Sequence, residues 1–214
     1  MPLTITVDPH PLLEPAAFVT RTGRPISELP TPAAVAELAT REARAPLAAS
    51  DAVRTAVRDL LRHGGFKPAG RSKPAPEYLT GAFAEDRFPR INALVDTCNV
   101  VSLHTGLPIS LVDVDLLEGE LAIRVAAPGT SYAFNPAGQV IDAGGLLCLY
   151  DAHGPSGSPV KDAQRTKTGG DTRCALSIVW GTRALAGRTE AAVRWYRELV
   201  AQIEGAELEE VALV

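Results

Sequence analysis

Cysteine and histidine are scarce in this chain, and their spacing excludes several kinds of site. The three cysteines, Cys98, Cys148 and Cys174, are an odd number and form no Cys-x-x-Cys pair, so we expect neither a disulfide framework nor a zinc knuckle. The four histidines form neither a His-Glu-x-x-His motif nor an i, i+4 pair, which are typical of metal sites on helices. We therefore expect no metal and no other cofactor.

Long hydrophobic runs and an excess of positive charge are also missing. No apolar run reaches the roughly 18 residues that span a bilayer, and the first residues, MPLTITVDPH, lack the basic and apolar regions of a secretion signal. We expect a cytoplasmic protein without membrane contact. The 21 Lys and Arg against 25 Asp and Glu give a net charge of −4. This charge excludes a general nucleic-acid coat and a DNA partner, but it leaves room for a local basic patch.

The composition is otherwise that of a folded globular protein. Hydrophobic residues make up 46% and charged residues 21% of the chain, close to the averages for globular domains. The 18 glycines and 17 prolines predict many turns. A chain of 214 residues is expected to form one domain, residues 1–214.

The N-terminal part is expected to be mainly helical. Apolar residues alternate over 3–7 and predict a short strand. Thr31 and Pro32 are typical of a helix N-cap and N1, and an alanine-rich helix is expected to run to about Arg44. Ser50 is expected to cap a second helix that ends at residues 63–65. We therefore interpret residues 1–63 as a helical N-terminal extension.

The rest of the chain is expected to contain both helices and strands. Residues 91–104 have helical spacing, with Gly106 as terminator, and a last helix is expected from Thr189, as N-cap, to Ile203, within a C-terminal helical segment 189–204. Between these helices the sequence predicts four strands, at 121–125, 131–134, 146–150 and 174–180. This order predicts an α+β fold in which N-terminal helices precede a mainly antiparallel sheet and a C-terminal helix.

Basic residues gather in two turn-rich segments. The segment 64–90 carries a basic excess that includes Lys67, Arg71 and Lys73, point charges able to contact an RNA backbone. The segment 161–173 carries Lys161, Arg165, Lys167 and Arg173 among hydroxyl, amide and glycine groups, which suits a pocket for a phosphate, a ribose or an ester carbonyl. The alternative for each segment is a solvated surface loop.

Helix 91–104 carries a polar stripe. Asn92, Asp96 and Asn99 lie at i, i+4 and i+7, and buried Asn or Asp side chains in a helix must find hydrogen-bond partners. One interpretation is a structural network that ties the helix to the sheet. The other is an amide that orients a substrate.

Several runs of sequence between about residues 64 and 182 are distinctive. They are 65–71 (GFKPAGR), 89–96 (PRINALVD), 101–103 (VSL) with 106–110 (GLPIS), 131–135 (SYAFN), and 158–162 (SPVKD) with 166–168 (TKT). In this order they resemble the B3/B4 domain family, the tRNA-editing module of the bacterial phenylalanyl-tRNA synthetase beta subunit, in a freestanding version. The resemblance covers over half of the chain and implies an α+β fold.

The resemblance also implies a kind of site. In the synthetase module a pocket hydrolyses tyrosine wrongly esterified to tRNA, by means of an asparagine, a histidine and a glutamate. By position, Asn99 resembles the asparagine, whereas Ser110 stands at the histidine position and Gln164 lies near the glutamate position.

An aminoacyl ester is already reactive, so its hydrolysis needs mainly a positioned water and stabilisation of the developing oxyanion. We expect donors for that oxyanion from Asn99, Ser110, Lys161, Thr166 and Lys167. Asp162 is then expected to orient the water or a lysine. The segments 64–73 and 158–168 are predicted to meet around one concave pocket that faces Asn99.

The leading hypothesis is a protein that binds the aminoacylated 3′ end of a tRNA and hydrolyses a mischarged ester in trans. It would be an aminoacyl-tRNA deacylase and not a complete tRNA ligase. The RNA contacts would come from Lys67, Arg71, Lys73 and Arg165. One alternative is a non-catalytic module that binds RNA or an amino-acid-like ligand. Another is a hydrolase or sensor for a free amino-acid-like metabolite.

Overall fold

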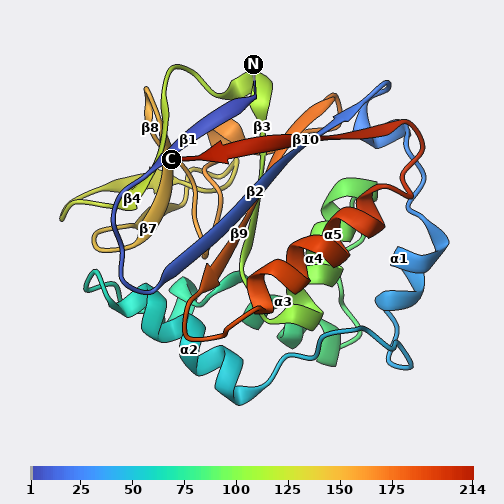
Figure 1. Ribbon diagram of the computed structural model, residues 1–214, viewed down its shortest axis with the longest axis horizontal. Coiled ribbons are helices and arrows are strands. Elements are labelled where there is room, and N and C mark those ends of the chain that lie inside the picture. Colours follow the sequence, from blue (N-terminus) through green and yellow to red (C-terminus); the bar gives the residue numbers. More distant parts are fainter. Residues whose placement is uncertain (1) are drawn as a thin grey trace.

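An eight-stranded sheet runs through the protein, as seen in a computed structural model that describes residues 2–214 (Figure 1). Its strand order is β3-β9-β2-β10-β1-β4-β7-β8. Parallel pairing is confined to β1 with β10 and β1 with β4, and the other pairs are antiparallel. The strands are β1 (Leu3–Val7), β2 (Leu13–Thr22), β3 (Ile109–Asp113), β4 (Leu121–Val125), β7 (Leu147–Asp151), β8 (Gly154–Gly157), β9 (Cys174–Thr182) and β10 (Ala206–Leu213).

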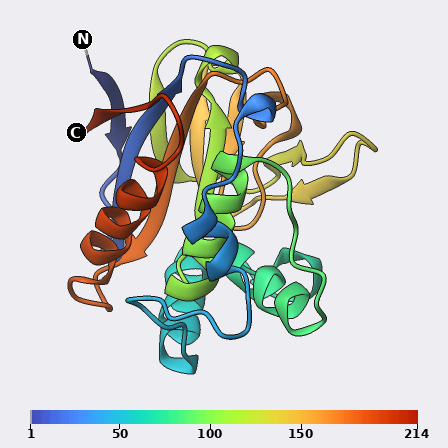
Figure 2. The same cartoon turned by 90° about the vertical axis from the view of Figure 1, so that its right-hand side faces the viewer.

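Five α-helices accompany this sheet in the part of the chain from residue 2 onward. They are α1 (Ala33–Leu38), α2 (Asp51–Arg62), α3 (Ala75–Ala84), α4 (Ala93–Thr105) and α5 (Arg188–Val200). Helices α4 and α5 pack together, α5 against β2 and β9 and α4 against β3 (Figures 1 and 2). A separate two-stranded hairpin, β5 (Ser131–Ala133) with β6 (Val140–Asp142), projects from the right of the body in Figure 2.

Capping residues in the sequence set where helices α2 and α4 begin and where α4 ends. The Ser50 side chain accepts a hydrogen bond from the backbone N–H of Val53 and begins α2. Asn92 does the same for α4 through the N–H of Val95, 3.0 Å away. Helix α4 ends at Gly106, whose φ of +69° is left-handed. A Cβ at this glycine would also lie 2.9 Å from a methyl carbon of Val53, so α2 and the end of α4 pack closely.

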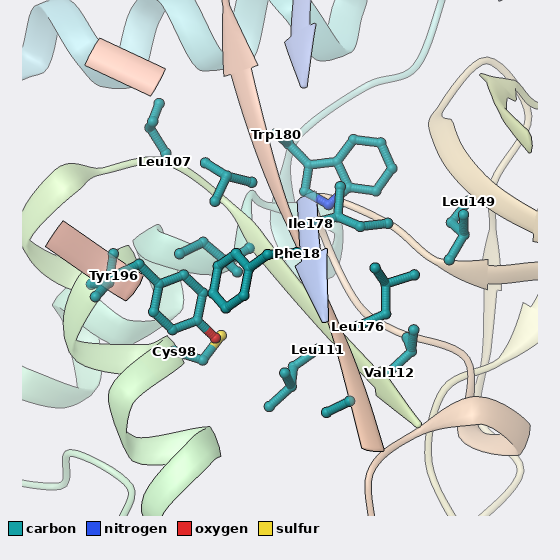
Figure 3. Packing of buried hydrophobic residues seen from close by; sticks show 14 of the residues in the cluster. Phe18, Cys98, Leu107, Leu111, Val112, Leu149, Leu176, Ile178, Trp180 and Tyr196 are labelled. Carbon is teal, nitrogen blue, oxygen red and sulfur yellow. The ribbon is translucent and has the colours of Figure 1, made fainter. Parts of the chain in front are cut away.

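The core lies between the sheet and helices α4 and α5. Strand β9 is buried along its whole length, and its Trp180 is among the largest fully buried side chains. Phe18 and Tyr196 meet edge to face with ring centroids 4.9 Å apart, and Cys98 lies beside the Tyr196 hydroxyl (Figure 3). Burial of each such side chain contributes roughly 1.5–3 kcal/mol. All three cysteines are free and buried, as expected for small core residues.

The predicted α+β class, with a mostly antiparallel sheet, is confirmed. The order of elements needs a correction, because residues 1–63, expected to be a helical extension, begin with two strands of the sheet, β1 and β2. Strand β2 escapes prediction because its first half, LEPAA, contains a proline and no alternation. The chain also continues beyond the C-terminal helix into β10, which pairs with β2 and β1.

Several boundaries differ from the sequence-based expectation. Helix α1 ends at Leu38 and not near Arg44. The segment 64–90, expected to be turn-rich, contains α3, which tolerates Pro76 because this residue lies in the first turn, where a missing N–H costs nothing. Helix α5 is capped by Gly187, so Thr189, the predicted N-cap, lies inside the helix and is buried. The four predicted strands correspond to β4, β5, β7 and β9, whereas β3, β6 and β8 were not predicted.

Candidate functional site

All four lysines of the chain lie in two loops. The first lysine loop, residues 64–74, connects α2 to α3 and carries Lys67 and Lys73. The second lysine loop, residues 158–173, connects β8 to β9 and carries Lys161 and Lys167. Within residues 2–214 none of the four lysines forms an ion pair. The charges of these four lysines are therefore not paired with a carboxylate there.

The two lysine loops lie side by side, as predicted. The backbone N–H of Ala75 donates a hydrogen bond to the carbonyl oxygen of Pro159 at 2.9 Å. The Lys161 ammonium lies 5.5 Å from the ring centroid of Tyr78, on α3. Burial, then the nearby charges of Arg71 and Lys167, lower the pKa of Lys161. Three cations from both loops thus share one neighbourhood.

The β5–β6 hairpin covers the two lysines of the second loop. The Lys167 ammonium donates a hydrogen bond to the carbonyl oxygen of Phe134 at 2.6 Å. The Lys161 ammonium lies 3.9 Å from the centroid of the Phe134 ring, a cation–π distance. The Tyr132 hydroxyl donates to the carbonyl oxygen of Lys161 at 2.6 Å. One hairpin therefore provides neutral partners for two ammonium groups.

Ser110 and Asp162 meet beneath the second loop in a buried polar cluster. The indole N–H of Trp180 donates to Ser110 Oγ at 2.9 Å, and this hydroxyl donates to the Ser158 carbonyl oxygen at 3.1 Å. The Asp162 carboxylate accepts hydrogen bonds from the backbone N–H groups of Leu111 and Ser158. Burial raises the pKa of Asp162 to about 6, although these hydrogen bonds oppose the shift.

Thr166 and Arg165 hold the second loop to the sheet. The buried Thr166 hydroxyl donates to the carbonyl oxygen of Ser156 at 2.8 Å. Arg165 donates to both carboxylate oxygens of Asp151, at 2.7 and 2.8 Å, and to the Ser156 hydroxyl. The Asp151 side chain is completely buried, and its pairing with Arg165 was not predicted from the sequence. Arg165, expected to contact RNA, is already engaged by these partners.

Two of the three residues in the polar stripe of α4 form structural hydrogen bonds, and the third, Asn99, differs. Asp96 accepts hydrogen bonds from the Thr31 hydroxyl at 2.9 Å and from the Ile91 N–H at 2.7 Å, and Asn92 caps the helix. The structural interpretation therefore holds for these two residues. Asn99 is half-buried, and within residues 2–214 its side-chain amide makes no hydrogen bond.

The exposed cations of the first loop are open to a partner. Lys67, Arg71 and Lys73 are all exposed, and the Tyr78 hydroxyl donates to the Gly70 carbonyl oxygen nearby.

Gln164, which stands near the expected glutamate position, has a buried side-chain oxygen with no hydrogen-bond partner in the part of the chain that is described. Residues 2–214 also contain no group of three His, Cys, Asp or Glu side chains able to hold a metal ion.

Five clefts along residues 2–214 lie away from Asn99 and from the second lysine loop, where the concave pocket was predicted, and one of them, of about 180 Å³, lies between α2 and α3. None of the five is lined by Asn99, Lys161 or Lys167. At the second lysine loop, Phe134 of the hairpin contacts both lysines, Lys167 through its carbonyl oxygen and Lys161 through its ring.

Two comparisons with known proteins agree with this architecture. The sequence model of the B3/4 domain matches residues 67–211, more than half of the chain. The chain belongs to the B3/4 domain family. No curated protein sequence matches it. The family resemblance expected from the sequence is thereby confirmed.

A solved structure has the same fold as this B3/4 domain protein. It is an N-terminal fragment of the phenylalanyl-tRNA synthetase beta subunit from Pyrococcus horikoshii, with a TM-score of 0.57 and 9% sequence identity. The match covers 99% of this chain and 51% of the fragment, so the chain spans about half of the length of that relative. In addition, no helix within residues 2–214 has the length and apolar character needed to cross a membrane.

Sequence reasoning missed the aromatic part of the site. Tyr132 and Phe134 lie in the run SYAFN that marks the family, and Tyr78 lies on the unpredicted helix α3. Aromatic residues are only 5% of the chain, so the presence of two of them in the run SYAFN was a usable signal. Their contacts with lysine required the fold, because hairpin and loop are more than twenty residues apart.

Proposed function

We propose that this B3/4 domain protein binds the aminoacylated 3′ end of a tRNA and hydrolyses a mischarged ester in trans. The observation that carries the proposal is the convergence of all four lysines, none of them paired with a carboxylate within residues 2–214, in two adjacent loops. The fold shared with a fragment of a tRNA synthetase subunit supports a tRNA-related partner. A protein with this function would work in the cytoplasm.

The exposed first lysine loop would contact the RNA backbone. Lys67, Arg71 and Lys73 are exposed to solvent and would supply point charges for phosphate oxygens. The contact with RNA would involve only a few phosphates, because the protein as a whole is acidic. Arg165 would support this surface indirectly, through its hydrogen bonds to Asp151.

The second lysine loop would act on the ester. A lysine ammonium next to the carbonyl would stabilise the oxyanion that develops when water attacks, and Lys161 and Lys167 are the cations available there. Asp162, with a pKa of about 6, is tuned for a general base at neutral pH. Asn99 would add an amide donor. Ser110 and Thr166 would hold the loop, since their hydroxyls already donate to backbone carbonyls.

The experiment that tests the proposal challenges the purified protein with a panel of tRNAs, each charged with a correct or an incorrect amino acid. Release of the amino acid is followed over time. Faster release from one mischarged tRNA than from its correctly charged counterpart is the expected result. A parallel arm with free amino-acid esters tests the alternative of a metabolite hydrolase, which would need no RNA.

A second candidate function has an observation in its favour. The hydroxyls of Ser110 and Thr166 are engaged in buried hydrogen bonds, and Ser110 stands where the resemblance leads us to expect a histidine. A non-catalytic module that binds RNA or an amino-acid-like ligand would keep the lysine loops and lack the hydrolysis. Binding of charged tRNA without release of any amino acid across the panel would favour this module.

A further inference from the structure

The β5–β6 hairpin stands apart from the eight-stranded sheet. It forms its own two-stranded sheet, and neither of its strands pairs with the eight-stranded sheet. Such an isolated hairpin is marginally stable by itself. Glycines flank it on both sides, Gly129 with φ +82° and Gly145 with φ +78°. Figure 2 shows the hairpin projecting away from the other strands.

Phe134 makes the contacts of the hairpin with both lysine side chains of the second loop. The Phe134 carbonyl oxygen accepts the hydrogen bond of Lys167, and the Phe134 ring faces Lys161. Tyr132 adds hydrogen bonds at the foot of the hairpin, and the buried Ile141 anchors the second strand. The end of the hairpin beyond Phe134 is exposed, including Val140 at 60%.

The partners that Phe134 offers are weak ones for a cation. The hydrogen bond from the Lys167 ammonium to the Phe134 carbonyl is already charge-assisted, but a carbonyl carries no net charge, so it lacks the Coulomb attraction that a phosphate oxygen would add. Asp162 is the nearby carboxylate, but its oxygens already accept two backbone N–H groups. Burial lowers the pKa of both Lys161 and Lys167; the charges of Arg71 and Lys167 lower that of Lys161 further, whereas Asp162 opposes the shift of Lys167.

We propose that the hairpin is a displaceable cover over an anion site made by Lys161, Lys167 and Arg71, and that phosphate oxygens of an RNA displace Phe134 from the two lysines. The anion takes over the ammonium groups, the carbonyl and ring of Phe134 separate from them, and the exposed end of the hairpin beyond Tyr132 moves outward. This inference rests only on the anion-binding part of the proposed function and not on ester hydrolysis.

The first test measures affinity in a variant that lacks the competing ring. Phe134→Ala removes the cation–π hold and a part of the packing, so the uncovered site is populated more often in the free protein and binds the anion about two- to fivefold more tightly. The probes are a single-stranded RNA trinucleotide and inorganic pyrophosphate, measured by calorimetry. Val140→Ala, on the same hairpin but exposed, is the matched control and leaves both affinities unchanged.

The second test observes the movement itself. The native cysteines are buried, so spin labels attach selectively to Val140→Cys on the hairpin and to Leu116→Cys on the body, both exposed in the wild type. Adding the trinucleotide lengthens or broadens the distance between the labels. In a Lys161→Gln, Lys167→Gln background the same addition leaves it unchanged. A response to pyrophosphate but not to RNA would identify a free phosphate compound as the ligand.

Two results would overturn the proposal. One is a Phe134→Ala protein that binds the trinucleotide and pyrophosphate equally well or more weakly than the wild type, which would make the ring irrelevant or a part of the binding surface. The other is an unchanged label distance at saturating anion. Phe134→Leu, which keeps apolar volume but loses the π face, replaces the alanine variant if the latter does not fold. Failure of deacylation would contradict the proposed hydrolysis and leave these outcomes unaffected.

Discussion

Arg165 and Asp151 form a two-pronged ion pair that fastens the second lysine loop to strand β7, with N···O distances of 2.7 and 2.8 Å. The carboxylate is completely buried, and the guanidinium is one-third exposed. Burial alone would raise the pKa of Asp151, but hydrogen bonds from Arg165 and from two backbone N–H groups lower it below its usual value. The pair therefore contributes stability that is present above pH 4 and is lost as the pH falls lower.

Removing the arginine should unfold the loop and not merely weaken RNA binding. We expect Arg165→Ala to lower the free energy of unfolding by about 3–5 kcal/mol, because it leaves a buried carboxylate without its partner. Urea denaturation at pH 7 measures this loss. Arg71→Ala removes an exposed arginine of the neighbouring loop and serves as control, with a change within about 0.5 kcal/mol. A stable Arg165→Ala protein with weakened RNA binding would show that Arg165 is an RNA contact.

Asp162 should make stability depend on pH in the opposite direction. Its pKa in the folded protein is about 6, above the ordinary value of 3.8, so the folded state holds this proton more tightly than the unfolded state. The resulting stabilisation is full below pH 4 and disappears as the pH rises through 6. Asp162→Asn removes this dependence. We expect the free energy of unfolding of the wild type, minus that of the variant, to fall by at most about 3 kcal/mol between pH 4 and pH 7.

Kinetics on the same variant separate a catalytic from a structural Asp162. If this carboxylate is the general base, the wild-type rate of deacylation rises through an apparent pKa near 6, and the asparagine variant loses the rise. A pH-stability difference together with an unchanged pH-rate profile would make Asp162 a part of the buried cluster alone.

The role of Asn99 can be decided by comparing the stability of an Asn99 variant with its rate of deacylation. An amide aimed at a developing oxyanion is worth about 10²–10³ in rate, whereas the loss of partners for a buried structural asparagine costs about 1–3 kcal/mol of stability. Within residues 2–214 the Asn99 amide makes no hydrogen bond, so we expect Asn99→Ala to melt close to the wild type and to deacylate far more slowly. Asn92→Ala, which removes the cap of the same helix, is expected to lower the melting temperature instead. Normal deacylation by folded Asn99→Ala would move the catalytic role to Lys161 and Asp162.

The success of sequence reasoning in this protein depends on how local each signal is. Ser50 and Asn92 act on N–H groups three residues away. The Ser50 cap and the span of the following helix were therefore predictable, as was that of helix 91–104 to within two residues. Strand β2 was missed because its pairing partners, β9 and β10, lie more than 150 residues further along the chain. Only the fold could bring such partners together.

The same reasoning explains what was found and missed at the site. The lysine clusters are visible in the sequence, and the distinctive runs around them indicated the family. Nothing local, however, connects Arg165 to Asp151 or Lys167 to Phe134. Both pairs depend on how the loop after β8 folds back over its neighbours. They show that Arg165 and Lys167, which were expected from the sequence to contact RNA or substrate, already have partners within the protein.

The strength of RNA binding should depend on salt in proportion to the phosphates that the first lysine loop neutralises. Each phosphate contact adds a slope of roughly −0.7 to −0.9 to a plot of log affinity against log salt concentration. Arg71 and Lys73 are exposed and form no ion pair within residues 2–214. The double variant Arg71→Ala, Lys73→Ala should therefore flatten the slope by about one to two units, measured with tRNA between low and physiological salt.

A matched control is available on α2, where Arg54 and Arg62 are equally exposed but each forms an ion pair with a carboxylate of the same helix, Asp51 or Asp59. Replacing both by alanine removes the same formal charge from the protein. Because those arginines are already compensated by a neighbouring carboxylate and lie outside the lysine loops, the slope should stay at its wild-type value. If both double variants flatten it equally, only the net charge of the protein matters. If neither does, the first lysine loop is a solvated turn and the RNA, if bound, lies elsewhere.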